Sequence, residues 1–532
     1  MAPDKIFLGI LLVLVGCISL CFLRRKSVNK PYKGPAIYPI IGSAVEFFRN
    51  RHRVLQWFAE IMEKMPTNTF KLERPGGITD IMTGNPANVE HILKTKFEDY
   101  PKGERFTILL HDFLGRGILN VDGELWKMQR KTASYEFNTK SLRSFVVETV
   151  QWEIQNRLLP VLTNASKMGK SLDLQDILER FAFDNICSVA FGVDPACLLP
   201  SMPTPPFAKA FDDATEISAG RFYSAVPFWW RVKRMLNIGS EKRLGEAIKL
   251  VNGFAMDVVS SRRKEISENR SGLPEREDLL SRFMAALLNN RDELGIDDES
   301  ESEKQSSGTM DMFLKEMVVS FLLAGRDTTS AALTWFFWVL SSHQRVEEAI
   351  RTEVLNILAK RSQTPPADEE GYFCFSFEEL KDMQYLHAAL CESMRLYPPV
   401  PADAKLASID DVLPDGTFVG KGWHVSYLNY SMGRMENIWG SDCLQFKPER
   451  WLKGGEFVGE NQYKFPVFHA GPRICLGKEM ALIQMKLIVA SIIHRFHFVI
   501  EDGITCPDYV VSLTMRMKGG LPVTVRCRRP EH

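Results

Sequence analysis

Hydrophobic residues recur at helical spacing along most of the chain, which predicts a mainly helical protein. Apolar positions return every three to four residues between polar breaks. The stretches predicted as long helices are 140–159, 240–268, 310–342, 377–396 and 478–494. Shorter stretches in which apolar and polar residues alternate, 418–425 and 521–526, favour strands. The predicted fold class is therefore mainly α with small β-sheets.

Polar breaks divide the helices without dividing the chain into separate cores. Two segments, 297–307 and 361–371, are acidic or proline-rich and contain too few apolar residues to bury, which is typical of solvated loops. Ser376 and Glu379 have the spacing of a capping box, so a helix is expected to begin there. The chain contains no internal repeat. We therefore expect a single large domain over residues 43–532.

The first thirty residues are predicted to anchor the chain in a membrane. Residues 6–23 form an uninterrupted apolar run of 18 residues, close to the shortest helix that spans a bilayer. Basic residues follow it, which by the positive-inside rule places the rest of the chain in the cytosol. A cleaved signal peptide is the alternative, but no small-x-small cleavage site follows the run. Residues 1–30 are thus interpreted as a single-pass anchor with its basic stop, and the proline-rich residues 31–42 as a stiff hinge.

Composition and charge exclude several other classes of protein. The 532 residues are 45% hydrophobic and 25% charged, as in an ordinary globular protein. Because 66 basic side chains balance 66 acidic ones, no nucleic-acid partner is expected. The ten cysteines form neither CxxC pairs nor a regular framework, so neither a zinc site nor a disulfide scaffold is indicated.

One cysteine stands in a loop directly before a predicted helix, and its surroundings indicate a reactive thiolate. The loop has the pattern F-x-x-G-x-R-x-C-x-G, formed by Phe468, Gly471, Arg473, Cys475 and Gly477. Free backbone N–H groups at a helix N-terminus favour a thiolate. The two glycines allow backbone conformations and close approaches that a Cβ would obstruct. The arginine presents a forked donor for a carboxylate. A buried structural cysteine is the alternative for any single cysteine.

A second candidate site lies in the middle of the longest helical stretch. Ala324 and Gly325 are small enough for a flat macrocycle to approach the backbone, and Asp327 and Thr328 follow them. The Thr328 hydroxyl can bond to the carbonyl of the preceding turn and open the helix locally into a groove. A hydroxyl beside a carboxylate suits proton delivery. A second membrane span over 318–340 is the alternative, but Arg326 and Asp327 at its centre would cost roughly 2.5–3.5 kcal/mol each.

Together these motifs resemble the cytochrome P450 family, and the resemblance covers residues 31–525 in the expected order. It implies haem b with Cys475 as the iron ligand, and it assigns no role to His469. It implies that Asp327 and Thr328 deliver protons, that Glu392, Arg395 and Arg450 form a structural charge triad, and that haem contacts come from the set Trp126, Arg130, Ala324, Gly325, Lys405, Phe468, Gly471, Arg473, Cys475 and Gly477.

The family resemblance also implies a reaction and partners. The expected activity is a monooxygenase that inserts one oxygen atom from O2, with electrons from NADPH through a separate NADPH–cytochrome P450 reductase. The expected location is the endoplasmic reticulum membrane. Lys127, Lys131, Lys464, Lys478 and Lys486 are candidates for a basic docking face for the reductase, or are ordinary solvated lysines. A hydroperoxide-rearranging haem-thiolate enzyme and a non-catalytic haem protein are the alternatives, and neither would need the acid–alcohol pair.

The substrate is expected to be lipophilic, because the segments that line the pocket in the family are mostly apolar here. Several segments, such as Tyr100-Pro-Lys-Gly and Asp122-Gly-Glu-Leu-Trp, resemble the plant fatty-acid ω-hydroxylase clan. They are most similar to its branch that also oxidises jasmonoyl-amino-acid conjugates and sterol side chains. The prediction is hydroxylation of a terminal or near-terminal carbon of a lipophilic chain, expected to be a fatty acid, with C-26 hydroxylation of a sterol and ω-oxidation of a jasmonoyl conjugate as alternatives. Residues 225–230 are expected to dip into the membrane interface or to be plain core.

Overall fold

The computed structural model describes residues 34–137, 140–199, 201, 206–224, 226–268, 278–289, 303–361, 375–500 and 507–528. The predicted anchor, its basic stop and most of the two predicted polar loops lie outside these residues. Among the helices that the structure describes, none is long and apolar enough to cross a membrane. The fold is mainly helical with small sheets, as predicted.

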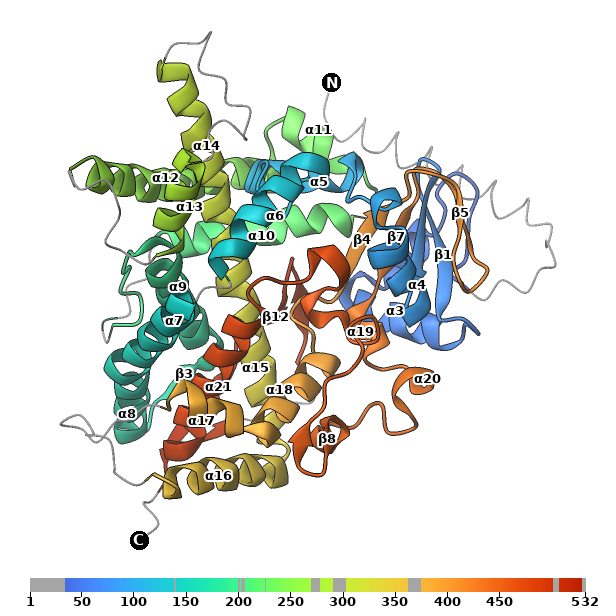
Figure 1. The fold of residues 1–532 in the computed structure, drawn as a ribbon. Helices are drawn as coiled ribbons and strands as arrows, with labels where there is room; N and C mark the ends of the chain where they lie inside the picture. The colour runs from blue at the N-terminus through green and yellow to red at the C-terminus, as the bar shows by residue number, and fades with distance from the viewer. Residues whose placement is uncertain are drawn as a thin grey trace, which may run out of the picture.

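The longest helical stretch runs through the middle of the molecule in three parts. It comprises α14 (Glu303–Leu322), a single π-helical segment η6 (Leu323–Asp327) and α15 (Thr328–Ser341). Figure 1 shows α14 and α15 crossing the molecule, with other helices on one side and a sheet on the other. Nearly every side chain of α15 is buried, as expected of a helix that is hydrophobic on all sides. The apolar stretch that resembled a membrane span is therefore the core helix of the domain.

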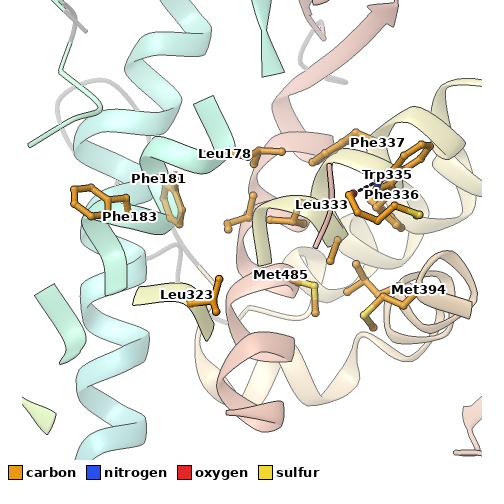
Figure 2. Packing of buried hydrophobic residues seen from close by; sticks show 14 of the residues in the cluster. Leu178, Phe181, Phe183, Leu323, Leu333, Trp335, Phe336, Phe337, Met394 and Met485 are labelled. Atoms are coloured by element: carbon orange, nitrogen blue, oxygen red, sulfur yellow. Dashed lines mark hydrogen bonds between the residues drawn. The ribbon is translucent and has the colours of Figure 1, made fainter. Parts of the chain in front are cut away.

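Helices that are distant in the sequence pack around this core helix. Figure 2 shows Phe181 of α9 (Leu174–Phe191) on one side of it, and Met394 of α18 (Gln384–Leu396) and Met485 of α21 (Lys478–Arg495) on the other. Trp335 ties the middle of α15 to β12 (Met515–Met517), because its indole Nε1 donates to the Met515 carbonyl at 2.6 Å. Its ring also stacks on Tyr397 with the ring centroids 4.7 Å apart. The core thus holds the central helix rigidly beside the site.

The remaining predicted helices are present, with breaks that periodicity did not indicate. The stretch 140–159 forms α7 (Lys140–Glu153), a π-helical segment η4 (Ile154–Leu158) and the start of α8 (Leu159–Met168). The stretch 240–268 is α12 (Gly239–Glu268). The capping box at Ser376 is confirmed, but the helix it begins, α17 (Phe377–Asp382), ends before Met383, and α18 follows. The predicted helix 478–494 is α21.

A four-stranded sheet lies at one end of the molecule (Figure 1). Its strands, in order, are β1 (Thr69–Arg74), β2 (Ile78–Thr83), β7 (His424–Tyr427) and β4 (Asp403–Leu406). Only the β2–β7 pair is parallel. The prediction of one strand over 418–425 is wrong, because a turn at Gly422, which has a φ of +81°, separates β6 (Phe418–Val419) from β7. The predicted strand 521–526 is confirmed as β13 (Pro522–Cys527).

Shorter elements complete the described fold. The other helices are α2 (Ala44–Arg49), α3 (Val54–Glu63), α4 (Pro86–Glu90), α5 (Glu104–Leu114), α6 (Gly123–Phe137), α10 (Pro206–Phe222), α11 (Trp229–Met235), α13 (Leu279–Asn289), α16 (Gln344–Ala359), α19 (Asn429–Met432) and α20 (Glu436–Trp439). The other strands are β3 (Ser171–Asp173), β5 (Asp411–Val412), β8 (Leu452–Lys453), β9 (Glu456–Phe457), β10 (Phe496–Ile500), β11 (Tyr509–Val511) and β12 (Met515–Met517). Strands β10, β13 and β3 form a second antiparallel sheet.

Candidate active site

A cavity of about 520 Å³ lies between the central helix and the cysteine loop. Its wall is mostly apolar and combines residues from the sheet, from α5, α6 and α10, from η6 and from the segment before α21. The predicted site residues that line it are Trp126, Arg130, Ala324, Gly325, Thr328, Phe468, Arg473, Cys475 and Gly477. Three others, Asp327, Lys405 and Gly471, lie behind the wall. The fold thus brings both predicted motifs to one enclosed space.

The cysteine loop is held in place by its backbone. Gly471 has a φ of +66°, and a Cβ there would lie 2.1 Å from the carbonyl oxygen of Leu93, so only glycine fits. The Cys475 amide donates to the Phe468 carbonyl at 2.8 Å. The loop ends at Gly477, directly before α21. These constraints fix the Cys475 thiol in the wall of the cavity.

The thiol of Cys475 is exposed to the cavity, and the surrounding protein keeps it away from bulk solvent. Burial raises the pKa of this thiol, whereas the backbone N–H of Gly477 and the positive charges of Arg130 and Lys478 lower it. A cation bound at the sulfur would favour the thiolate further. The environment therefore suits a sulfur ligand to a metal, because two cations and a backbone amide stabilise the negative charge of the thiolate.

Opposite the cysteine loop, η6 opens the central helix as the Thr328 hydroxyl was predicted to do. Its Oγ1 donates to the Ala324 carbonyl at 2.6 Å across the π-helical turn. Gly325 has a further reason to be glycine, because a Cβ there would lie 2.5 Å from Ile186 of α9. The groove places a hydroxyl at the cavity wall and packs the helix closely against α9.

Asp327 does not stand beside the Thr328 hydroxyl in the cavity wall, which corrects the predicted arrangement. Its carboxylate is buried and accepts a hydrogen bond from Arg326 at 3.1 Å. Arg326 also donates to Asp212 of α10 at 2.8 Å and lies 3.6 Å from Glu179 of α9. Burial raises the pKa of Asp327 to about 6, although Arg326 opposes the shift. The carboxyl can therefore exchange a proton near neutral pH from a position one residue behind the cavity.

At another side of the cavity, α6 presents the predicted tryptophan and arginine. The Arg473 guanidinium lies 4.4 Å from the centre of the Trp126 ring and donates to Asp122 at 2.6 Å. The Arg130 side chain has no hydrogen-bond partner among the described residues. Its guanidinium and the Trp126 indole are thus available to an acidic group in the cavity.

Lys405 was expected in the cavity wall, and the structure places it behind Asp403. The Lys405 Nζ donates to Asp403 Oδ2 at 3.2 Å, and burial lowers the pKa of this lysine to about 7. Lys102 lies 3.7 Å from the other carboxylate oxygen and does line the cavity. Asp403 belongs to the segment 400–403 that the family resemblance places in the pocket wall, and it lines the cavity. Lys102 was missed, although it belongs to the segment Tyr100-Pro-Lys-Gly that carried the family resemblance.

Charge around the cavity matches the group that the motifs imply. Three cationic side chains, Lys102, Arg130 and Arg473, and Lys405, which burial leaves only partly protonated near pH 7, accompany the two carboxylates Asp122 and Asp403, so positive charge is in excess. A porphyrin with two propionates carries the complementary charge, and the apolar remainder of the wall suits its macrocycle. The residues present fit a haem, and in that fit Cys475 would bind the iron.

The predicted charge triad lies behind the cavity and braces the chain. Glu392 is fully buried and accepts from Arg395 through both carboxylate oxygens, each at 2.8 Å. It also accepts from the Arg450 Nε at 3.3 Å, from the Lys447 amide at 3.0 Å and from the Trp451 indole at 2.9 Å. None of the triad lines the cavity, so the geometry favours a scaffolding role.

One of the five lysines predicted as a docking face for the reductase is buried in the structure. Lys486 is buried in α21 and donates to the Leu380 carbonyl at 2.8 Å, so it cannot contact a partner. Lys127, Lys131 and Lys478 are exposed, and Lys464 is half-buried beside Glu460. The exposed lysines remain candidates for docking.

The segment 225–230 is divided between core and surface. Phe228 and Trp229 are about half exposed, whereas Trp230 is buried beneath the Arg221 guanidinium, 4.4 Å from the ring centre. Met235, the last residue of α11, is exposed, as are Leu236 and Ile238, which follow it. The two alternatives predicted for this segment therefore apply to different residues.

A thiol held opposite an opened helix, across an apolar cavity with an excess of positive charge, defines a haem-thiolate type of site. The family model for cytochrome P450 matches residues 32–518. The chain is 48% identical to cytochrome P450 94A2 of Vicia sativa over 526 residues, which cover 96% of each protein. It is 45% identical to cytochrome P450 94B1 of Arabidopsis thaliana, covering 95% of this chain and 93% of the relative. The chain belongs to the cytochrome P450 family, which makes it a monooxygenase with a haem-thiolate cofactor.

Proposed function

We propose that this monooxygenase hydroxylates the terminal carbon of a fatty acid. The observation that carries the proposal is the single cavity in which Cys475 and Thr328 share a mostly apolar wall. Such a wall accommodates an extended hydrocarbon chain and leaves its end beside the reactive centre. The resemblance to the fatty-acid ω-hydroxylase clan, together with the similarity to cytochromes P450 94A2 and 94B1, supports this substrate class.

The haem, when bound, activates O2 and inserts one of its oxygen atoms into a C–H bond. Cys475 would hold its iron, and Trp126, Arg130 and Arg473 would bind its propionates. The Thr328 hydroxyl lies in the cavity wall and would pass a proton inward. Asp327, tied to Arg326, would hold the next proton on the outward side. The apolar wall orients the substrate and excludes water.

We propose that residues 1–30 anchor the protein in the endoplasmic reticulum membrane and that residues 31–42 form the hinge to a catalytic domain over 43–532. Exposed apolar side chains near α11, such as Phe228 and Trp229, support contact with the membrane interface. Electrons would come from NADPH through NADPH–cytochrome P450 reductase. The exposed Lys127, Lys131 and Lys478 support a basic docking face.

Incubation of the holoenzyme with reductase, NADPH and lauric acid tests the proposal. The expected product is 12-hydroxylaurate, formed only when both reductase and NADPH are present. A hydroxylated cholesterol and a jasmonoyl-amino-acid conjugate are run in parallel. If the sterol or the jasmonoyl conjugate is hydroxylated and lauric acid is not, the fatty acid is refuted as the substrate. Conversion of a lipid hydroperoxide without NADPH would indicate a rearranging enzyme.

The role of Thr328 is tested in the same assay. Thr328→Val removes the hydroxyl and keeps the shape, so NADPH consumption should yield peroxide or water in place of product. Thr328→Ser keeps the hydroxyl and should retain most of the coupling. Unchanged coupling in Thr328→Val would contradict the proton-delivery role.

A further inference from the structure

The cavity extends from Cys475 to the four-stranded sheet, and its character changes there. Arg74 at the end of β1, Asp80 in β2 and His424 in β7 line it, together with Tyr223, the residue after α10. The Arg74 Nη1 donates to the Phe222 carbonyl at 2.9 Å, which joins the sheet to the end of α10. Figure 1 shows α10 running toward this sheet. A second group of polar side chains, apart from those beside the cysteine loop, thus closes one end of a mostly apolar space.

This polar group has an excess of positive charge. The buried Asp80 carboxylate accepts from the Arg74 Nε at 2.7 Å and from the Arg105 Nη2 at 2.9 Å. His424 Nδ1 lies 3.9 Å from Asp80. Burial and the two arginines lower the pKa of His424 to about 4, so its ring is neutral near pH 7. Two guanidinium groups therefore face a single carboxylate, and within the described part of the chain one positive charge is left without a counter-ion.

The same group holds polar atoms that have no partner among the residues that the structure describes. His424 is buried, and its Nε2 has no hydrogen-bond partner. The Tyr223 hydroxyl has no hydrogen bond among the described residues, and burial raises its pKa to about 12, so it remains a donor. Among these residues the Arg74 Nη2 also has no acceptor. A buried polar group is rarely left unpaired without a reason, so the His424 Nε2, together with two donors of the cavity wall that have no partner among the described residues, indicates a ligand.

We propose that Arg74, Tyr223 and His424 bind the carboxylate of the substrate. An anion with two acceptor oxygens would neutralise the excess charge and accept from a guanidinium, a phenol and an imidazole. The inference rests on the proposed function and adds to it a specificity for free acids. The carboxylate belongs either to a fatty acid or to the amino-acid part of an acyl conjugate.

The position of this carboxylate subsite agrees with oxidation at the opposite end of the chain. Tyr427, at the other end of β7, donates to Asp403 at 3.3 Å, and Asp403 lies 3.3 Å from His469 of the cysteine loop. His424 is three residues away along the strand, a distance of about 10 Å. A chain held at Arg74 would therefore extend away from the carboxylate subsite toward Thr328 and Cys475.

Binding titrations of the holoenzyme test the subsite without relying on turnover. Lauric acid and methyl laurate are titrated separately, and the shift of the haem Soret band on substrate binding gives a Kd for each. The ester has the same chain without the charge, so its Kd reports the integrity of the apolar wall. The ratio of the two Kd values isolates the carboxylate contribution.

Wild type is expected to bind the acid at least about tenfold more tightly than the ester. Arg74→Met should remove most of this preference and leave the ester Kd unchanged. Tyr223→Phe, which disturbs the fold less, should reduce the preference about two- to tenfold, as expected for one neutral hydrogen bond. Arg105→Met separates charge from contact, because Arg105 pairs with the same Asp80 but does not line the cavity. It removes the excess charge without removing a hydrogen-bond donor to the ligand, so it should reduce the preference less than Arg74→Met does.

Failure of the inference can be separated from failure of the proposed function. If the wild type converts both lauric acid and its ester at the terminal carbon but has no preference for the acid, the carboxylate subsite is refuted and the proposed activity stands. An acid preference that is unchanged in both Arg74→Met and Tyr223→Phe refutes it as well. N-Lauroylglycine distinguishes the two sources: binding that is tighter than that of laurate and depends on Arg74 assigns the subsite to conjugates, and weaker binding with the same dependence assigns it to fatty acids.

Discussion

Replacing Glu392 with glutamine is expected to destabilise the protein far more than the same change at an exposed glutamate. Glu392 accepts five hydrogen bonds, and its own accessibility and that of the Arg395 side chain are both 0%. Glutamine keeps the shape but removes the charge, so the Arg395 guanidinium would remain buried without a counter-ion. Removing one partner of a buried ion pair costs about 3–5 kcal/mol.

Glu378→Gln is the matched control. Glu378 pairs with Lys381 at the same i,i+3 spacing that joins Glu392 to Arg395, but its side chain is 78% exposed and that of the lysine 55%. Such surface pairs contribute about 0–1 kcal/mol. Guanidinium denaturation of the holoenzyme is followed by both circular dichroism and haem absorbance. It gives the change in unfolding free energy of each variant relative to wild type, provided that the m-values of the three proteins agree. A loss of less than about 1 kcal/mol in Glu392→Gln, equal to that of the control, would refute the scaffolding role of the triad.

Two further predictions concern the cysteine loop and the central helix. Gly471→Ala should impair folding and haem uptake, because left-handed backbone costs a non-glycine residue about 1–3 kcal/mol and the new Cβ would meet the Leu93 carbonyl. Gly477→Ala should fold normally, since its Cβ would lie 3.9 Å from the nearest atom, Phe137 Cε1; equal loss of unfolding free energy in the two variants would contradict this account. Asp327 should make stability depend on pH. Because burial raises its pKa to about 6 in the folded protein from an ordinary 3.8, the folded state binds more protons between these values, and stability falls as pH rises through that window. Asp327→Asn should therefore lose less unfolding free energy than wild type between pH 4 and pH 6, and parallel curves for the two proteins would show that the Asp327 carboxyl does not titrate in this range.

Much of the site could be predicted because its chemistry is local in the sequence. The cysteine loop depends on glycines and on a helix start that stand within ten residues of one another. The opening of the central helix follows from the hydroxyl of Thr328, which bonds to a carbonyl only four residues earlier. Local rules of this kind are readable from residue order.

Features that depend on neighbours distant in the sequence were missed or misplaced. Asp327 turns away from the cavity because Arg326, held by Asp212 of α10, binds it there. Lys405 lies behind the wall because Asp403 of the same strand binds it, and Lys102 from another part of the chain takes the position in the cavity wall. Lys486 was taken for a surface residue, although α21 is buried on most sides. Tertiary packing decides such positions, and periodicity alone does not reveal it.

The strand boundary at 418–425 failed for a different reason. The alternation of apolar and polar residues continues through the segment, but Gly420 and Gly422 lie within it. The positive φ of Gly422 turns the chain, so β6 pairs with β5 and β7 joins the large sheet. Glycine inside a strand pattern often marks a bend, so Gly420 and Gly422 could have predicted this break from the sequence.

The most direct test of the central claim is the carbon-monoxide difference spectrum of the reduced protein. Wild type should show the Soret band typical of thiolate ligation, and Cys475→Ala should lose it. Cys527→Ala is the matched control, because Cys527 is also a free, exposed cysteine but does not line the cavity, and it should keep the band. A thiolate band that persists in Cys475→Ala, or wild-type protein whose haem shows no thiolate band, would contradict the assignment of Cys475 as the iron ligand.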